Sequence, residues 1–236
     1  MPRKQSALKK LAVPVVRAAM KVPGVRKVLR GSGGGGAALG EFTVAGLRAS
    51  LEESLQRLRT EYVDVLFLHE ASPEALRQED LWKTLALLVQ AGKVRRVGLY
   101  GGVSMVAEGL ASGLDGLGAV QFGADAFDPV VDGFGREMLL VANHPFGGEA
   151  RVARMEAVLR EMAGDEAVPE ELREKLRGGD WGMVTEAVFG MALQGADALV
   201  LSMMREEHIR ENVRAVEKGR FTVEELGVLR ERMLGR

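Results

Sequence analysis

The stretch that decides the fold is 47–69, which reads LRASLEESLQRLRTEYVDVLFLH. Its first half spaces leucines three or four positions apart, the spacing of one face of an α-helix. These are Leu47, Leu51, Leu55 and Leu58. Thr43 stands just before them and can cap the helix. The second half, 62–68, is a short and nearly continuous apolar run, which is typical of a parallel strand buried on both faces.

The rest of the chain repeats this alternation of helix and strand. We expect further strands over 94–100, 119–122, 138–142 and 198–201, and helices over 79–90, 104–111, 150–162, 170–176, 183–193, 206–217 and 223–233. The last helix begins with a capping box that joins Thr222 and Glu225, and Phe221 is placed to pack on Leu226. Because strands alternate with helices, the sequence predicts parallel βαβ units.

The composition is that of a globular protein, with 236 residues, 47% of them hydrophobic, and a formal net charge of −1. The absence of cysteine excludes a disulfide scaffold, a thiolate zinc site and a cysteine nucleophile. The histidines are His69, His144 and His208, and we expect no metal site. No segment approaches the roughly 20 uninterrupted apolar residues of a membrane span. We therefore expect a cytoplasmic protein without an integral membrane segment.

The charges are distributed unevenly along the chain. Residues 1–40 contain nine lysines and arginines and no acidic residue, so a basic arm precedes an acidic body. The glycine-rich segment 31–36 is interpreted as a flexible linker, although glycines can also cradle a phosphate. We expect an arm and linker over 1–41 and one domain over 42–236. The arm has no aromatic residue to stack on bases, so we expect no nucleic-acid partner.

Polar residues collect where the predicted strands end. They are His69-Glu70, Tyr100-Gly101, Gln121, Asn143-His144-Pro145 and the segment 202–205. In parallel α/β folds, ligands bind beyond the carboxyl ends of the strands. The sequence therefore predicts a binding site at this edge.

Five motifs, in the same order, resemble those of the aldo-keto reductase family. The first motif joins SLEESLQRL at 50–58 and YVDVLFLH at 62–69, which are similar to a helix of the family and the histidine-ending strand after it. The other motifs are AGKVRRVG at 91–98, VQ at 120–121, HPFGG at 144–148 and the segment 202–212, which resembles the final phosphate-binding loop and helix. The resemblance covers about 42–234, and on it the chain is identified as a member of this family.

The resemblance implies a (β/α)₈ barrel that reduces small carbonyl compounds with NADPH. His69 matches the histidine that orients the carbonyl group, and Gln121 is suited to hold the nicotinamide carboxamide. Ser202, Arg205 and Asn212 match the family's contacts to the adenosine phosphate, and the guanidinium of Arg205 can bind a phosphate through two N–H groups. Each of these residues also has a purely structural interpretation, as a strand-end or helix-surface residue, and both interpretations stay open.

Part of the family's site has no counterpart in this sequence. The family's tyrosine and aspartate stand in a DTAxxYGxxE stretch, which is not present here, and its lysine also has no match. The two tyrosines lie elsewhere, Tyr62 at the start of a strand and Tyr100 where the family usually has a serine that holds the carboxamide. Asn143 replaces a tyrosine that stacks on the cofactor in the family.

We therefore expect a partial TIM barrel made of the last five βα units, with about five parallel strands and crossover helices. Five strands cannot close a barrel whose geometry is set for eight, so the outer strands would present unpaired edges. The basic arm, a second copy in a homodimer or a chain that completes the barrel would cover these edges.

The nominal function is NADPH-dependent reduction of a small aldehyde or ketone, with little or no activity of the isolated chain. Whether the protein is an enzyme stays open, because the tyrosine, lysine and aspartate are missing. The alternatives are a non-catalytic binding or regulatory subunit, that is, a pseudoenzyme, and a gene fragment or start-site error. A third possibility is a module that the arm tethers to an anionic surface.

Overall fold

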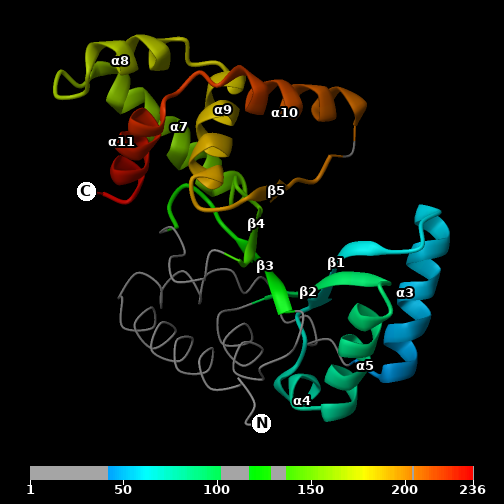
Figure 1. Cartoon of the computed structure of the whole chain (residues 1–236). Helices are drawn as coiled ribbons and strands as arrows, with labels where there is room; N and C mark the ends of the chain where they lie inside the picture. Colours follow the sequence, from blue (N-terminus) through cyan, green and yellow to red (C-terminus); the bar gives the residue numbers. More distant parts are fainter. Residues whose placement is uncertain (1–41, 102–116, 129–136, 204, 236) are drawn as a thin grey trace. The chain divides into compact units, whose positions relative to one another are not determined.

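The computed structural model describes residues 42–101, 117–128, 137–203 and 205–235 (Figure 1). The predicted arm and linker over 1–41 and the predicted helix over 104–111 lie outside the described residues. The boundary between arm and domain therefore stays a prediction. Among the described residues, no helix has the length and apolar character needed to cross a membrane.

The sheet consists of five strands that follow each other in the order β1-β2-β3-β4-β5. They are β1 (Val63–His69), β2 (Val94–Tyr100), β3 (Leu117–Gly123), β4 (Leu139–Asn143) and β5 (Ala198–Val200). Pairing is parallel between β1 and β2, β2 and β3, and β4 and β5. With the helices between these strands, this confirms the predicted class, a partial (β/α)₈ barrel. Within the described residues, β1 and β5 stand at the two ends of the strand order.

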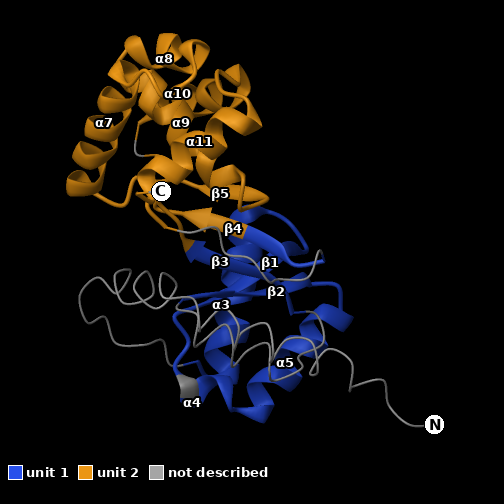
Figure 2. Cartoon of the chain, turned by 90° about the vertical axis from the view of Figure 1, so that its left-hand side faces the viewer, with its two compact units in different colours: residues 1–122, 132–140 blue, residues 123–131, 141–236 orange. Residues whose placement is uncertain are grey.

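The chain divides into two compact units, which are coloured separately in Figure 2. Unit 1 comprises Met1–Phe122 and Asp132–Leu140, and unit 2 comprises Gly123–Val131 and Val141–Arg236. Among its described residues, unit 1 has the helices α3 (Val44–Leu58), α4 (Pro73–Leu76) and α5 (Glu79–Gln90). Those of unit 2 are α7 (Glu149–Gly164), α8 (Glu170–Arg177), α9 (Trp181–Leu193), α10 (Glu206–Lys218) and α11 (Val223–Met233).

Unit 1 is held by aliphatic side chains between its helices and strands. The least exposed members of this core are Leu68, Leu81, Leu85, Val94, Val97 and Leu99. The predicted cap of α3 is confirmed, since the Thr43 hydroxyl oxygen accepts a hydrogen bond from the Gly46 N–H at 3.0 Å. Leu58, which lies on the same face as the other leucines, is the last residue of α3 and is 65% exposed. The chain turns away directly after it, at Arg59, whose φ is 54°.

Within unit 1, β1 and β2 approach each other closely at one glycine. A Cβ atom on Gly98 would lie 2.5 Å from the ring of Phe67. Real Cβ atoms do not come this close, so the phenylalanine ring needs a residue without a side chain beneath it.

Unit 2 is a helical layer around α9, which is buried on nearly all sides. Of its 13 residues, nine are buried, including Met183, Phe189 and Met191. The predicted capping box of α11 is confirmed, because Thr222 and Glu225 exchange both hydrogen bonds. Phe221 and Leu226 are both buried in the core cluster of this unit. In contrast, none of the residues of α10 is buried.

Candidate functional site

In unit 1, the strand register brings the predicted residues of β1 and β3 to one edge. His69 is paired in register with Tyr100, and Tyr100 with Gln121, so all three stand at the carboxyl ends of adjacent strands. This is the edge at which the sequence predicts a site. The roles predicted for His69 and Gln121 stay predictions.

The ring of His69 lies against that of Tyr100. The two ring centroids are 4.4 Å apart and the planes are tilted by 54°. The backbone continues this pairing for one more residue, because the Glu70 N–H donates to the Tyr100 carbonyl oxygen at 2.7 Å. Glu70 then adopts a left-handed conformation with φ of 49°, and the chain leaves the sheet. His69 itself is exposed, so one side of its imidazole remains accessible to a ligand.

In unit 2, β4 and β5 present a second stretch of the same kind of edge. Asn143 is paired in register with Val200, so the segments 144–148 and 201–203 both leave the sheet at the carboxyl ends. Ser202 and Arg205 are exposed. Arg205 is the N-cap residue of α10, and its side chain makes no capping hydrogen bond.

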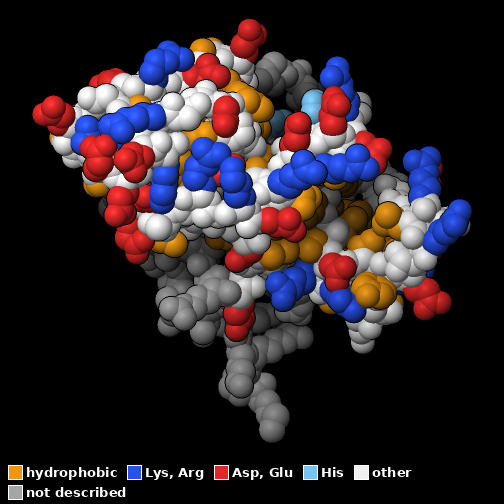
Figure 3. All heavy atoms as spheres, turned by 90° about the horizontal axis from the view of Figure 1, so that it is seen from above, with side chains coloured by type: hydrophobic (Ala, Val, Ile, Leu, Met, Phe, Trp, Pro, Cys, Tyr) orange, Lys and Arg blue, Asp and Glu red, His pale blue; other side chains and the backbone are white. Residues whose placement is uncertain are grey.

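The charges around Arg205 are mixed. Its Nη1 atom lies 3.5 Å from Oε1 of Glu207, and its side chain is 71% exposed. Glu206 pairs with Arg210 one turn further along α10 at 2.5 Å. Figure 3 shows the same mixture on a larger scale, with basic and acidic side chains interspersed over the face that it draws. Arg205 is therefore reachable by a phosphate but already has a carboxylate beside it.

Asn212 lies two turns after Arg205, on the same face of α10. Seven residues of an α-helix rise by about 10 Å, so the two side chains start from points that far apart along the axis. Asn212 is half-buried. A ligand that contacts both residues must extend along the helix by this length.

Asn143 shows an unusual environment at the end of β4. It is only 6% exposed, and its Oδ1 atom is buried without a hydrogen-bond partner among the described residues. A buried acceptor without a partner is unfavourable by about 1–3 kcal/mol. The sequence singled out Asn143 as a departure from the family pattern, but no sequence signal showed that its amide oxygen would be unpartnered.

A carboxylate pair that the sequence reasoning missed follows β3. The Phe127 N–H donates to Asp125 Oδ1 at 2.8 Å, and the Asp125 N–H donates to Asp128 Oδ2 at 3.1 Å. Burial, followed by the neighbouring charge of Asp125, raises the pKa of Asp128 to about 6. Arg230 of α11 donates to the Asp128 carbonyl oxygen at 3.1 Å. The signal that could have found this turn is the D-x-x-D spacing directly after a predicted strand.

Turn geometry after β4 restricts one further position. Gly147 has φ of 62°, and a Cβ atom there would lie 2.4 Å from Asp125 Oδ2. Arg151, in the first turns of α7, approaches the same carboxylate oxygen at 3.5 Å. The HPFGG turn is thus fixed against the turn that follows β3. In the part of the chain that the structure describes, no three histidine or acidic residues are grouped so that they could hold a metal ion.

Comparison with known proteins agrees with this architecture. A sequence model described as the aldo/keto reductase family matches residues 16–105. None of the curated proteins compared with the chain matches it in sequence.

Solved structures of aldo-keto reductases share the fold. A thermostable aldo-keto reductase, Tm1743, crystallised with the inhibitor epalrestat, is 23% identical with a TM-score of 0.58 over 80% of this chain and 66% of that chain. The holo form of the aldo-keto reductase AKR11C1 from Bacillus halodurans is 17% identical with a TM-score of 0.58, over 80% and 67%. The aldose reductase from Schistosoma japonicum is 17% identical with a TM-score of 0.54, over 81% and 65%. The chain thus spans about two thirds of the length of each of these structures.

Proposed function

We propose, from the match of residues 16–105 to the aldo/keto reductase family and from the fold shared with solved aldo-keto reductases, that this chain is a member of the family that binds NADPH and orients a small carbonyl compound, with little or no turnover of its own. The observation that carries this proposal is the register of His69, Tyr100 and Gln121 at the carboxyl ends of adjacent strands. An exposed imidazole at that edge can donate a hydrogen bond to a carbonyl oxygen and polarise it. The amide of Gln121 can hold a carboxamide group at the same edge.

Unit 2 supplies the residues that would hold the phosphates of the cofactor. Ser202 offers a hydroxyl group, Arg205 a bidentate guanidinium, and Asn212 an amide two turns along α10. The N-terminus of α10 adds free N–H groups and the positive end of the helix dipole. The bound cofactor would supply the hydride for carbonyl reduction. The exposed residues fit a phosphate, and Glu207 weakens the fit because it competes for Arg205.

The proposal of little turnover rests on the proton that the reduction requires. Tyr62 precedes β1 at its opposite end, and the guanidinium of Arg95 lies over its ring at 4.1 Å. Tyr100 stands at the correct end of the sheet, but its ring packs against His69. This sequence has no other tyrosine, and a phenol with an ordinary pKa near 10 needs a cationic neighbour to release its proton readily.

A second candidate function is a non-catalytic binding or regulatory subunit. The contact between His69 and Tyr100 favours it, because a ring packed on the imidazole restricts how a carbonyl group can approach. Glu206 and Glu207, in the first turn of α10, also favour it, because they oppose a phosphate there. In this alternative, a homodimer or a partner chain that completes the barrel provides the biological context.

The first experiment is a fluorescence titration of the purified chain with NADPH. We expect saturable binding at micromolar concentrations and a roughly tenfold weaker affinity for Arg205→Ala, which corresponds to about 1.4 kcal/mol. Arg214→Ala is the matched control, because Arg214 is exposed on the same helix nine residues further on, and therefore on the opposite face. Its affinity should equal that of the wild type.

Three results would contradict the proposal. An absence of binding at millimolar NADPH would overturn the cofactor site, and equal losses in both variants would show that Arg205 has no special role. Reduction of a model aldehyde such as 4-nitrobenzaldehyde by this chain alone would refute the expected lack of turnover.

A further inference from the structure

Three aromatic rings extend from the core of unit 2 to its surface. Phe189 of α9 is fully buried, Phe146 of the HPFGG turn is half-buried, and Trp181 is 52% exposed. The rings of Phe146 and Trp181 are nearly parallel, with centroids 5.3 Å apart and planes 20° from each other. Phe146 in turn contacts Phe189 at 5.6 Å. We call these three residues the aromatic stack.

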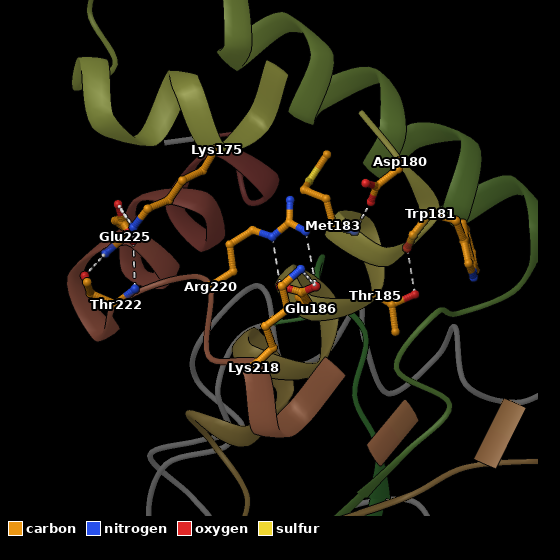
Figure 4. A network of polar contacts seen from close by, with 10 residues as sticks. All are labelled: Lys175, Asp180, Trp181, Met183, Thr185, Glu186, Lys218, Arg220, Thr222 and Glu225. Carbon is orange, nitrogen blue, oxygen red and sulfur yellow. Dashed lines mark hydrogen bonds and ion pairs between the residues drawn. The ribbon is translucent and has the colours of Figure 1, made fainter. Parts of the chain in front are cut away.

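The position of Trp181 in this stack is set by the start of α9. The preceding Asp180 accepts a hydrogen bond from the Met183 N–H at 2.6 Å and so caps the helix. The Thr185 hydroxyl donates to the Trp181 carbonyl oxygen at 2.8 Å. Figure 4 shows both bonds, with the indole turned away from the ion pairs of Glu186. Because Phe146 supports one face of the indole, the ring is already ordered although half of its surface is open.

The aromatic stack lies at the edge of unit 2 where the sequence predicts a binding site. Phe146 belongs to the turn that follows the carboxyl end of β4. Only four residues, 194–197, separate the C-terminal end of α9 from the start of β5, so the opposite end of α9, with Trp181, is at the carboxyl edge. Ser202 and Arg205 leave β5 at this same edge. Ligands of parallel α/β folds bind there.

The other tryptophan of the chain differs from Trp181 in its burial and in the hydrogen bond of its indole N–H. Trp82 of unit 1 is half-buried, and its indole N–H donates to the Leu76 carbonyl oxygen at 2.5 Å. The indole N–H of Trp181 has no partner among the described residues. No other tryptophan or phenylalanine of the described residues is as exposed as Trp181. An ordered, accessible indole with a free donor is suited to stack on a planar ring and to hydrogen-bond its edge.

We propose that the open face of Trp181 binds a planar aromatic ring of the ligand held at this edge. The ring is either the purine of a nucleotide or the aryl group of an aromatic carbonyl compound, because both offer a flat π-surface of similar chemistry. This inference deepens the proposed function and rests on it in assuming that the edge carries a ligand. Trp181 thereby becomes a specificity-determining residue that selects aromatic over aliphatic ligands.

The test uses Trp82→Phe, which leaves Trp181 as the single tryptophan of the full chain. Its fluorescence is followed while adenosine 2′,5′-bisphosphate or benzaldehyde is added, and cyclohexanecarbaldehyde serves as the non-planar aldehyde. We expect saturable quenching by the bisphosphate if the ring is a purine, or by benzaldehyde if it is an aryl group, and none by cyclohexanecarbaldehyde. Calorimetry should then show at least fivefold weaker binding of the effective probe to Trp181→Leu. Trp82→Phe and Trp181→Phe should each change the affinity for this probe less than twofold.

Three outcomes separate this inference from the proposed function. If neither aromatic probe quenches Trp181 saturably, or if Trp181→Leu binds the effective probe as the wild type does, the inference is wrong. If NADPH binds and depends on Arg205 but not on Trp181, and benzaldehyde does not quench, the proposed function stands and this inference fails. If NADPH does not bind but benzaldehyde quenches saturably and cyclohexanecarbaldehyde does not, the aromatic site stands and the cofactor proposal fails. The unfolding temperature of each variant confirms that it is folded, and Trp181→Phe retains the stacking ring should Trp181→Leu unfold.

Discussion

The two units place their charges differently. In unit 1, the ion pairs lie in solvent, as between Lys83 and Glu79, whose side chains are 62% and 81% exposed. In unit 2, the Glu186 side chain is only 6% exposed and accepts hydrogen bonds from Lys218 at 3.1 Å and from Arg220 at 2.8 Å (Figure 4). Solvated pairs add little stability, whereas removing one partner of a buried pair leaves an uncompensated charge. We infer that unit 1 depends on apolar packing alone, whereas unit 2 adds a small number of buried charged contacts to its own apolar core.

The largest expected effect is that of Glu186→Gln in unit 2. The change leaves Arg220, whose side chain is 19% exposed, without its carboxylate partner. We expect the free energy of unfolding to fall by about 3 kcal/mol, as measured by urea denaturation. Glu79→Gln in unit 1 is the control and should leave the unfolding midpoint unchanged. Equal losses of unfolding free energy in the two variants would show that the buried pair of unit 2 contributes no more stability than the exposed pair of unit 1.

The second largest effect is expected in unit 1, where it tests the role of apolar packing. Gly98→Ala places a methyl group against the ring of Phe67, where a Cβ atom would lie 2.5 Å away. Overpacking of this kind costs about 2 kcal/mol, which thermal unfolding would show. Gly118→Ala, on the neighbouring strand, approaches only the flexible side chain of Arg96, at 3.3 Å, and should be tolerated. If Gly98→Ala is as stable as Gly118→Ala, packing is not what holds unit 1.

The smallest expected effect is the pH dependence that Asp128 gives to the free energy of unfolding. Its pKa is raised from 3.8 to about 6, so between about pH 4 and 6 the folded chain binds a proton that the unfolded chain has released. This contribution to the free energy of unfolding therefore decreases as the pH rises through that range. Asp128→Asn should stabilise the protein by about 1 kcal/mol at pH 8, after allowance for partial exposure, and not at pH 4. Asp64→Asn, at an exposed pair of unit 1, should produce no such pH-dependent gain, and a gain at both pH values would refute the assignment.

The sequence best predicts the elements that have both a periodic apolar pattern and a residue signal at one boundary. The expected bounds of α5, β2 and α11 match the structure; Gly92 follows α5 and the capping box opens α11. By contrast, α9 begins two residues earlier than expected because Asp180 caps it. The four-residue helix α4 was missed, since it is too short to show periodicity and its signal is the pair Ser72-Pro73.

For the candidate site, the sequence indicates the edge but not its contacts. That His69, Tyr100 and Gln121 would stand together follows from strands that end at these residues. The stacking of Trp181 on Phe146 joins residues 35 positions apart, and the link between Glu186 and Arg220 joins residues 34 positions apart. No local pattern reports such contacts, because they depend on how the helices of unit 2 pack.

The absence of any buried residue in α10 has a consequence for affinity. The far end of this helix is anchored through Lys218 to Glu186, while its first turn, next to Arg205, faces solvent. Local stability is lowest where few apolar contacts hold a segment, so amide hydrogen exchange should be fastest in that first turn. A phosphate that requires an ordered turn must then supply the free energy of ordering it, which is subtracted from the binding energy. Affinity at Arg205 is therefore set in part by the helix propensity of residues that never touch the ligand.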